Sequence, residues 1–157
     1  MKKGIILSSL LAMGIFSSCG TTKAIVNTET QVRGDWTVTD VQLQGTSGTV
    51  AATVFDEAPY ECYRGSQWHL VQNNNSGTYT LNGGGDCPAG TNSIKWTITD
   101  DGASKYFNFK RVNNEKAKNV LTGYQMRIQS VSDNSMTLVQ DVSFEGKTIG
   151  IVYHLTK

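Results

Sequence analysis

The stretch QVRGDWTVTDVQLQG, residues 31–45, contains the first clear β-strand of the chain, preceded by a glycine. Trp36 and Val38 are apolar and the residues between and beside them are polar, which is the period of a strand with one buried face. Arg33–Asp35 also spells the RGD tripeptide that animal adhesion receptors recognise. An adhesion motif requires an exposed loop tip, whereas this one leads directly into a strand. We therefore interpret Gly34 and Trp36 as the start of a β-sheet protein.

The same period of two recurs along the rest of the chain. The alternating apolar sets are Trp68/Leu70, Tyr79/Leu81, Ile94/Trp96/Ile98, Phe107/Phe109, Tyr124/Met126/Ile128, Met136/Leu138 and Ile149/Ile151/Tyr153/Leu155. Turn residues separate them, as in Asn73–Gly77 and Asp100–Gly102. With Trp36–Leu43 and Thr49–Phe55 this predicts about nine strands joined almost entirely by hairpins. We expect residues 33–157 to form an all-β, antiparallel up-and-down β-barrel of eight or nine strands, with a β-sandwich as the alternative.

The interior of such a barrel has two uses. About eight strands enclose a space that side chains fill or that holds one small ligand. The predicted inward side chains are rich in aromatic rings and include methionines, which adapt to a guest and fill a core equally well. The candidate ligand-binding residues are Trp36, Trp68, Trp96, Phe107, Tyr124, Met126 and Tyr153. Core packing is the alternative role for each of them.

Residues 1–18 are predicted to be a lipoprotein signal peptide. Lys2 and Lys3 precede the apolar run Gly4–Phe16, which is too short to cross a bilayer as a helix but fits a leader core. Small residues then precede Cys19, in a pattern that resembles the lipobox of bacterial lipoproteins. That resemblance implies cleavage before Cys19 and acylation of the cysteine. A plain secretory peptide cut elsewhere is the alternative.

Residues 19–32 have no clear periodicity, and we expect a lipidated cysteine followed by a flexible tether. Two or three acyl chains on Cys19 would hold the protein firmly at a membrane, because a single chain binds only reversibly. Gly20, in place of Asp, and the absence of an acidic cluster after the cysteine imply by resemblance an outer-membrane lipoprotein of the cell envelope that faces the periplasm.

The cysteine count agrees with export. Once Cys19 is lipidated, Cys62 and Cys87 remain, and an even pair in an exported chain most simply forms a disulfide. Two buried free thiols are the alternative. His69 and His154 have no Cys or His partner at metal-ligand spacing, so we expect no metal and no cofactor.

Charge and motifs argue against nucleic-acid binding and catalysis. Without Lys2 and Lys3 the chain has 12 basic and 13 acidic residues, a net charge of −1, and it has no basic stripe. The nucleophile motif Gly-x-Ser-x-Gly does not occur. The acidic pairs Asp56/Glu57 and Asp100/Asp101 lie in turns, where carboxylates are usually solvated or bond the backbone. A paired-carboxylate hydrolase remains a minor alternative, and we expect a protein that is not an enzyme.

Taken together, residues 32–157 resemble the lipocalin-like lipoproteins of Bacteroides and its relatives. The segments that carry the resemblance are Gly34–Trp36, Cys62–Leu70, Asn75–Tyr79, Cys87, Ile94–Trp96, Gly123–Tyr124 and Phe144–Ile149. The resemblance implies that Gly34 lets the chain approach closely and that Trp36 packs across the closed end of the barrel. The family also stacks a late arginine on that tryptophan, but no arginine follows Arg127 here.

The resemblance implies a membrane-anchored protein that binds or carries a small apolar molecule in the cell envelope. The alternative is a structural or partner-binding envelope lipoprotein with a filled barrel and no ligand. In that second case we expect exposed loops, including Tyr60 and Tyr63, to contact an envelope protein partner.

Overall fold

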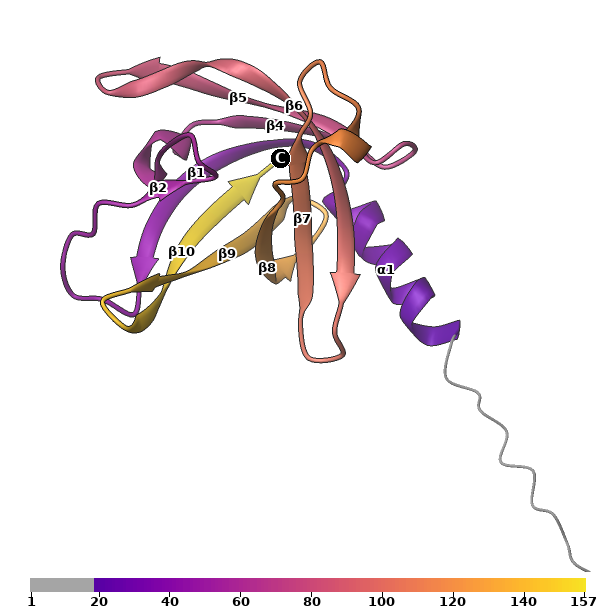
Figure 1. Cartoon of the computed structure of the whole chain (residues 1–157). Helices are drawn as coiled ribbons and strands as arrows, with labels where there is room; N and C mark the ends of the chain where they lie inside the picture. Colours follow the sequence, from indigo (N-terminus) through magenta and orange to yellow (C-terminus); the bar gives the residue numbers. More distant parts are fainter. Residues whose placement is uncertain (1–18) are drawn as a thin grey trace, which may run out of the picture.

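The computed structural model describes residues 19–157, so the predicted leader lies outside the described residues (Figure 1). Eight strands form one closed antiparallel barrel in the order β1-β10-β9-β8-β7-β6-β5-β4. They are β1 (Gly34–Gln44), β4 (Gln67–Val71), β5 (Ser76–Gly84), β6 (Cys87–Asp100), β7 (Lys105–Arg111), β8 (Tyr124–Val131), β9 (Ser135–Phe144) and β10 (Lys147–Thr156). From β4 to β10 each strand pairs with the next along the chain, and β1 closes the barrel. The up-and-down barrel is confirmed, and the sandwich alternative is wrong.

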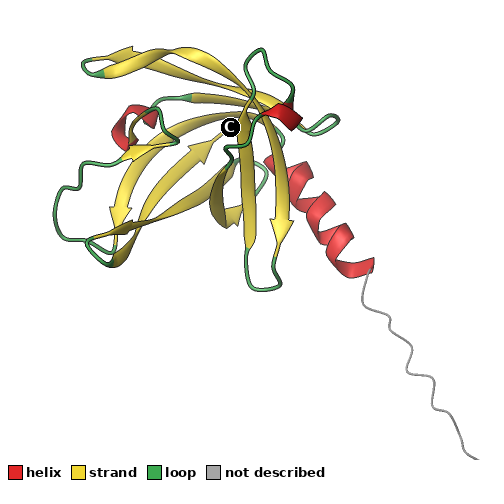
Figure 2. Ribbon diagram, in the orientation of Figure 1, coloured by secondary structure: helices red, strands yellow, loops and turns green. Residues whose placement is uncertain are grey.

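The predicted strand Thr49–Phe55 is wrong as a barrel strand. Only β2 (Thr53–Val54) is extended there, and it pairs with β3 (Ala58–Pro59) in a separate two-stranded hairpin. Phe55 and Asp56 have φ angles of +52° and +50°, and this left-handed backbone turns the chain back after β2. A 3₁₀ turn, η1 (Tyr60–Tyr63), follows the hairpin (Figure 2), and η2 (Ala117–Asn119) lies between β7 and β8.

The two ends of the barrel differ. The closed end is where β1 begins and β10 ends, and α1 (Cys19–Val32) lies there beside the end of β6 (Figure 1). The open end carries residues 45–66, the β5–β6 hairpin and residues 112–123, which join strands whose ends meet there. The described helices of residues 19–157 include none long and apolar enough to cross a membrane.

The predicted flexible tether, residues 19–32, is instead the helix α1. Ile25 packs against the barrel core, and Thr28 and Val32 are buried, so three residues at spacings of three and four form a short apolar stripe. Lys105 Nζ donates a hydrogen bond of 2.9 Å to Thr28 Oγ1. The stripe was missed because it is short and set among polar residues, and tertiary contacts rather than propensity stabilise such a helix.

The closed end explains the glycine and the tryptophan of the first strand. Gly34 has a φ of +119°, and a Cβ there would lie 3.1 Å from Lys157 Cε. Trp36 is buried, and its Nε1 donates a hydrogen bond of 2.7 Å to the carbonyl of Val32. Lys157 Nζ lies 4.4 Å from the centroid of the Trp36 ring, a cation–π contact. The C-terminal lysine thus occupies the place that the resemblance assigns to a late arginine.

The alternating apolar residues line the interior as predicted. Every member of the sets from Trp68 to Leu155 is buried except Tyr124 and Ile128, which are half-buried. The polar residues between them face outward, as cross-strand pairs such as Thr97 with Asn108 show. The period of two therefore predicted correctly which face of each barrel strand is inside.

Candidate functional site

The tip of the β2–β3 hairpin, Phe55–Glu57, occupies the open end of the barrel. Phe55 is only 3% exposed. Its ring meets four aromatic rings that come from η1, β7, β8 and β10, with centroid distances of 5.2 Å to Tyr63, 5.1 Å to Phe109, 5.4 Å to Tyr124 and 6.1 Å to Tyr153. A side chain from a loop therefore fills the space between the barrel walls.

Glu57 lies at the centre of a polar cluster beside that ring. Its Oε2 accepts hydrogen bonds of 2.7 Å from the Tyr63 hydroxyl and 2.5 Å from the Tyr79 hydroxyl. Its Oε1 accepts one of 2.7 Å from Asn92 Nδ2 and lies 3.5 Å from Arg111 Nη1. The Glu57 side chain is 14% exposed. The expectation of a solvated or backbone-bonded turn carboxylate is wrong for Glu57.

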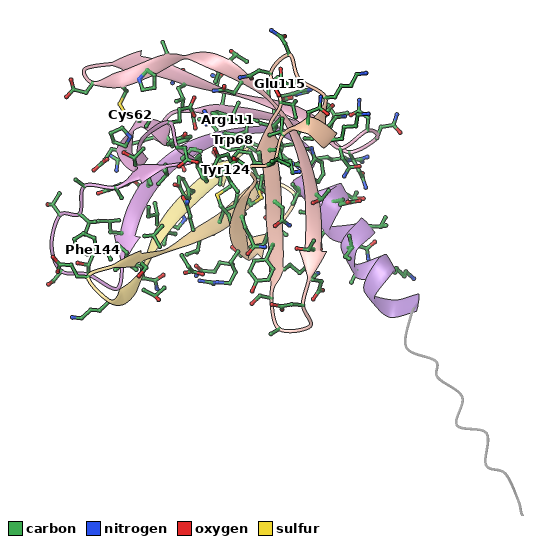
Figure 3. The ribbon with its side chains drawn as sticks, in the orientation of Figure 1. Cys62, Trp68, Arg111, Glu115, Tyr124 and Phe144 are labelled. Atoms are coloured by element: carbon green, nitrogen blue, oxygen red, sulfur yellow. A yellow bond between two sulfur atoms is a disulfide. The ribbon has the colours of Figure 1, made fainter. Side chains whose placement is uncertain are left out.

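Arg111 ties this cluster to the neighbouring strand. Figure 3 labels Arg111 and Tyr124 in the middle of the view, and Arg111 Nη2 donates a hydrogen bond of 3.2 Å to the Tyr124 hydroxyl. The guanidinium carbon also lies 5.7 Å from the centroid of the Tyr124 ring. The Tyr124 hydroxyl in turn lies 3.3 Å from Asp56 Oδ2. Both carboxylates of the hairpin tip therefore meet donors from the barrel wall.

The tyrosines of the cluster act as neutral donors. Burial raises the pKa of Tyr63 and of Tyr79 far above the usual value, and the hydrogen bonds to Glu57 raise both further. One guanidinium and several uncharged donors thus surround a single carboxylate. Within the part of the chain that the structure describes, no three His, Cys, Asp or Glu side chains gather to hold a metal ion. The donors around Glu57 fit recognition of a carboxylate.

The backbone of the hairpin tip is strained. The left-handed conformation costs about 1–2 kcal/mol for a residue other than glycine, and both Phe55 and Asp56 adopt it. Burying a phenylalanine side chain stabilises by about 1.5–3 kcal/mol. Burial of the ring therefore offsets much of this strain, and the burial of Val54 and Ala58 together with the contacts of Glu57 holds the hairpin in the barrel.

The predicted disulfide between Cys62 and Cys87 is confirmed, with a Cα–Cα distance of 5.4 Å. It ties η1 to the first residue of β6, so η1 stays attached to the barrel wall even if the hairpin moves. Tyr60 and Tyr63 are 7% and 0% exposed, and the expectation that they are displayed to a partner is wrong.

Five of the seven candidate ligand-binding residues are linked through contacting rings to Phe55. Tyr124 and Tyr153 contact Phe55 directly. Trp68 stacks on Tyr79 at 4.7 Å, and Phe107 lies 6.4 Å from Trp68. Trp96 stacks on Phe107 at 5.9 Å, so Trp68, Trp96, Phe107, Tyr124 and Tyr153 belong to one aromatic system that extends from the open end into the barrel.

In the described part of the chain, the other two candidates have no ring contact with this system. Trp36 covers the closed end, as described above. Within the system, Trp96 Nε1 also donates a hydrogen bond of 2.8 Å to the carbonyl of Ser76. Met126 is buried in the same core cluster. Whether any of the seven contacts a ligand stays a prediction.

Sequence reasoning missed Phe55, Glu57, Asn92 and Arg111. A signal existed for two of them, because Asn92 lies two residues before Ile94 and Arg111 two residues after Phe109. The period of two therefore continues the inward face to a polar residue at each position. No comparable signal marked Phe55 or Glu57, which reach the interior from a loop.

A further hollow lies on the outer face of β6, β7 and β8, beneath η2. It has a volume of about 480 Å³, and its lining includes Lys95, Lys110 and Lys118. Lys110 Nζ donates a hydrogen bond of 3.0 Å to the carbonyl of Val120, which holds residues 112–123 over this face. The groove adjoins the site at the open end, because Tyr124 lines it and also accepts a hydrogen bond from Arg111.

Comparison with known proteins agrees with this architecture. The sequence model of the lipocalin-like domain matches residues 24–138, which is most of the chain. No curated protein and no solved structure matches the chain significantly. The matched segment includes the part of α1 from residue 24 onward, the strands from β1 to β8 and the hairpin that fills the open end. The chain therefore belongs to the lipocalin-like domain family.

Proposed function

We propose that this protein binds a small apolar molecule in the open end of its barrel, as an envelope lipoprotein anchored through Cys19. The observation that carries the binding proposal is the composition of the open end. Aromatic rings surround Phe55, and Tyr79, Asn92 and Arg111 converge beside it. A mostly apolar space with a few converging polar groups is typical of small-molecule sites.

Binding requires the β2–β3 hairpin to move, because Phe55 fills the space in this conformation. The backbone strain at Phe55 and Asp56 opposes the interactions that hold the hairpin seated, and so lowers the free energy needed to withdraw it. The disulfide limits the movement to the hairpin and the preceding loop, since η1 stays tied to β6. The barrel walls can therefore remain in place while the open end clears.

The anchor proposal is supported by the leader pattern and by the position of α1. The helix begins at Cys19 and continues into the closed end, and its 14 residues span about 21 Å. An acylated Cys19 would hold the closed end towards the membrane and leave the open end accessible. We propose an outer-membrane lipoprotein facing the periplasm, of the kind found in Bacteroides and its relatives, without enzymatic activity.

Tryptophan fluorescence tests the binding proposal. The full chain with Cys19→Ala, freed of lipid by solvent extraction, is titrated with 4-phenylbutan-1-ol and with hexadecan-1-ol. We expect saturable quenching that Trp68→Phe removes, because Trp68 contacts Tyr79 and Phe109 of the open end. Trp36→Phe is a comparison variant and should reduce the signal less, because Trp36, although paired with Trp68 across β1 and β4, packs under Lys157 rather than against Tyr79 and Phe109.

One observation favours the second candidate, a partner-binding lipoprotein with no ligand. The open end is already filled by the chain itself, through Phe55. The segment displayed most clearly is 112–123, where Leu121 is 92% exposed. A photo-crosslinker at Leu121 should then capture one specific envelope protein. Flat titrations, with no co-purifying molecule in native mass spectra of envelope-derived protein, would decide for this candidate.

A further inference from the structure

We infer that the molecule bound in the open end is an apolar carboxylic acid, and that the hairpin tip Phe55–Glu57 is an internal mimic that competes with it. The inference rests on the proposed function and specifies the ligand class. It comes from what the hairpin tip presents to the barrel: a phenyl ring in the apolar space and, two residues later, a carboxylate in the polar cluster.

The barrel wall supplies a carboxylate site that exists apart from the hairpin. Tyr79, Asn92 and Arg111 belong to β5, β6 and β7, three adjacent strands, and all three meet the Glu57 carboxylate. Tyr63 adds a fourth contact and is held near the wall by the neighbouring disulfide. These groups come from different elements and point at one place, so they remain assembled when the hairpin leaves.

Withdrawal of Glu57 determines the chemistry of the replacement. It would leave the Arg111 guanidinium, whose side chain is 24% exposed, without its carboxylate partner. A partly buried cation without a partner is unfavourable, and a neutral ligand does not correct that. A carboxylate restores both the charge pair and the hydrogen bonds of the tyrosine and asparagine donors, and hydrogen bonds to charged groups are the stronger kind.

The space occupied by the Phe55 ring determines the apolar part of the ligand. Phe55 lies against Phe109 and Tyr124, with Tyr63 and Tyr153 completing the surround. The carboxylate and the apolar part must therefore be close together in one small molecule, as in an arylalkanoic acid. An amine-bearing ligand is excluded, because its cation would face Arg111. The acid must also compete with the seated hairpin. Its apparent affinity is therefore the intrinsic affinity multiplied by the fraction of molecules in which the hairpin is withdrawn.

The test compares one acid with its matching alcohol. The full chain with Cys19→Ala is titrated with 4-phenylbutanoic acid and 4-phenylbutan-1-ol by calorimetry at neutral pH. We expect the acid to bind about tenfold more tightly or better. Glu57→Gln should raise the affinity for the acid by about tenfold, because it removes the competing charge, and should raise that for the alcohol less.

Variants of the barrel-wall residues test whether the preference for the acid arises at the Glu57 cluster. Arg111→Met should abolish the preference for the acid and leave the affinity for the alcohol nearly unchanged. Arg127→Met is the matched control, since Arg127 pairs with Asp141 away from the Glu57 cluster, and it should keep the preference. Tyr79→Phe removes one hydroxyl with little change of volume and should lower the affinity for the acid alone by several-fold. This variant tests the site even if Arg111→Met does not fold.

The possible outcomes separate the two proposals. Equal affinities for acid and alcohol, unchanged by Glu57→Gln and Tyr79→Phe, would overturn the carboxylate inference and leave the proposed binding function intact. Binding of neither compound, to the parent chain or to Glu57→Gln, would overturn the proposed function as well. Preference for the acid that survives in both wall variants would place the ligand elsewhere and refute the mimic.

Discussion

The contact between Lys157 and Trp36 gives a sharp test of how the closed end is held. Lys157 Nζ lies over the indole ring at 4.4 Å and donates a hydrogen bond of 3.2 Å to the carbonyl of Gln31, in the last turn of α1. Lys157→Met keeps most of the apolar stem but removes the charge and the donor. The substitution therefore separates these two interactions from simple packing.

The expected loss of stability can be worked out from the two interactions of Lys157, both of which lie at an exposed position. A cation–π contact at an exposed position contributes about 0.5–1 kcal/mol. The hydrogen bond adds a net contribution of about 0.5–1.5 kcal/mol. We expect Lys157→Met to lower the free energy of unfolding by about 1–2.5 kcal/mol. Lys157→Arg should keep it within about 0.5 kcal/mol, because a guanidinium also stacks on an aromatic ring and donates hydrogen bonds.

Urea denaturation at neutral pH, followed by circular dichroism, measures these changes. Lys147→Met is the matched control, since Lys147 starts β10, the strand that Lys157 directly follows, is exposed, and makes no side-chain hydrogen bond or ion pair with residues 19–157. It should change the free energy of unfolding by less than about 0.5 kcal/mol. In a Trp36→Leu background, the effect of Lys157→Met should shrink by the cation–π part. Equal losses in Lys157→Met and Lys147→Met would refute the assignment of Lys157 to the closed end.

Three further predictions concern the disulfide, the tyrosines and the anchor. Replacing Cys62 and Cys87 together by serine should lower the free energy of unfolding in urea by about 3 kcal/mol, and a loss below about 1 kcal/mol would contradict a stabilising link. The raised pKa values of Tyr63 and Tyr79 contribute stability that is complete below pH of about 10, the unfolded value, and is lost as pH rises further. Unfolding free energies measured across that range should fall by up to about 1.4 kcal/mol per pH unit for each tyrosine, whereas tyrosinate absorbance from all six tyrosines near pH 10 in folded protein would exclude this. Cys19→Ala should leave the protein unacylated and in the soluble fraction, and membrane retention of that variant would argue against the anchor.

Much of the fold was predictable because inward and outward side chains alternate along each barrel strand, and this alternation is visible in the local sequence. A period of two along each strand fixed which side chains point inward, from Trp68 in β4 to Leu155 in β10. The helix α1 was not predicted, because its stripe of Ile25, Thr28 and Val32 is short and is buried only by packing on the end of the barrel. The same limit explains why Lys157 was not recognised as the cation over Trp36.

In the candidate site, some residues could be placed from the sequence pattern and others only from the tertiary structure. Arg111 and Asn92 continue an inward period, so their sequence positions already place them on the interior face. Glu57 follows no period, and in the sequence it is one of two acidic residues in a turn. Only the folding of a hairpin back into the barrel brings its carboxylate to the donors of three strands.

The sequence by itself determined the eight barrel strands, their inward faces and the pairing of Cys62 with Cys87, because each depends on residue type and spacing along the chain, but it wrongly added Thr49–Phe55 as a further strand. Only the tertiary structure decided that Phe55 and Glu57 fill the open end, that α1 packs at the closed end, and that Lys157 covers Trp36. Those three features depend on contacts between segments far apart in the chain. Such contacts have no local period, and the closed barrel supplies the surfaces that make them favourable.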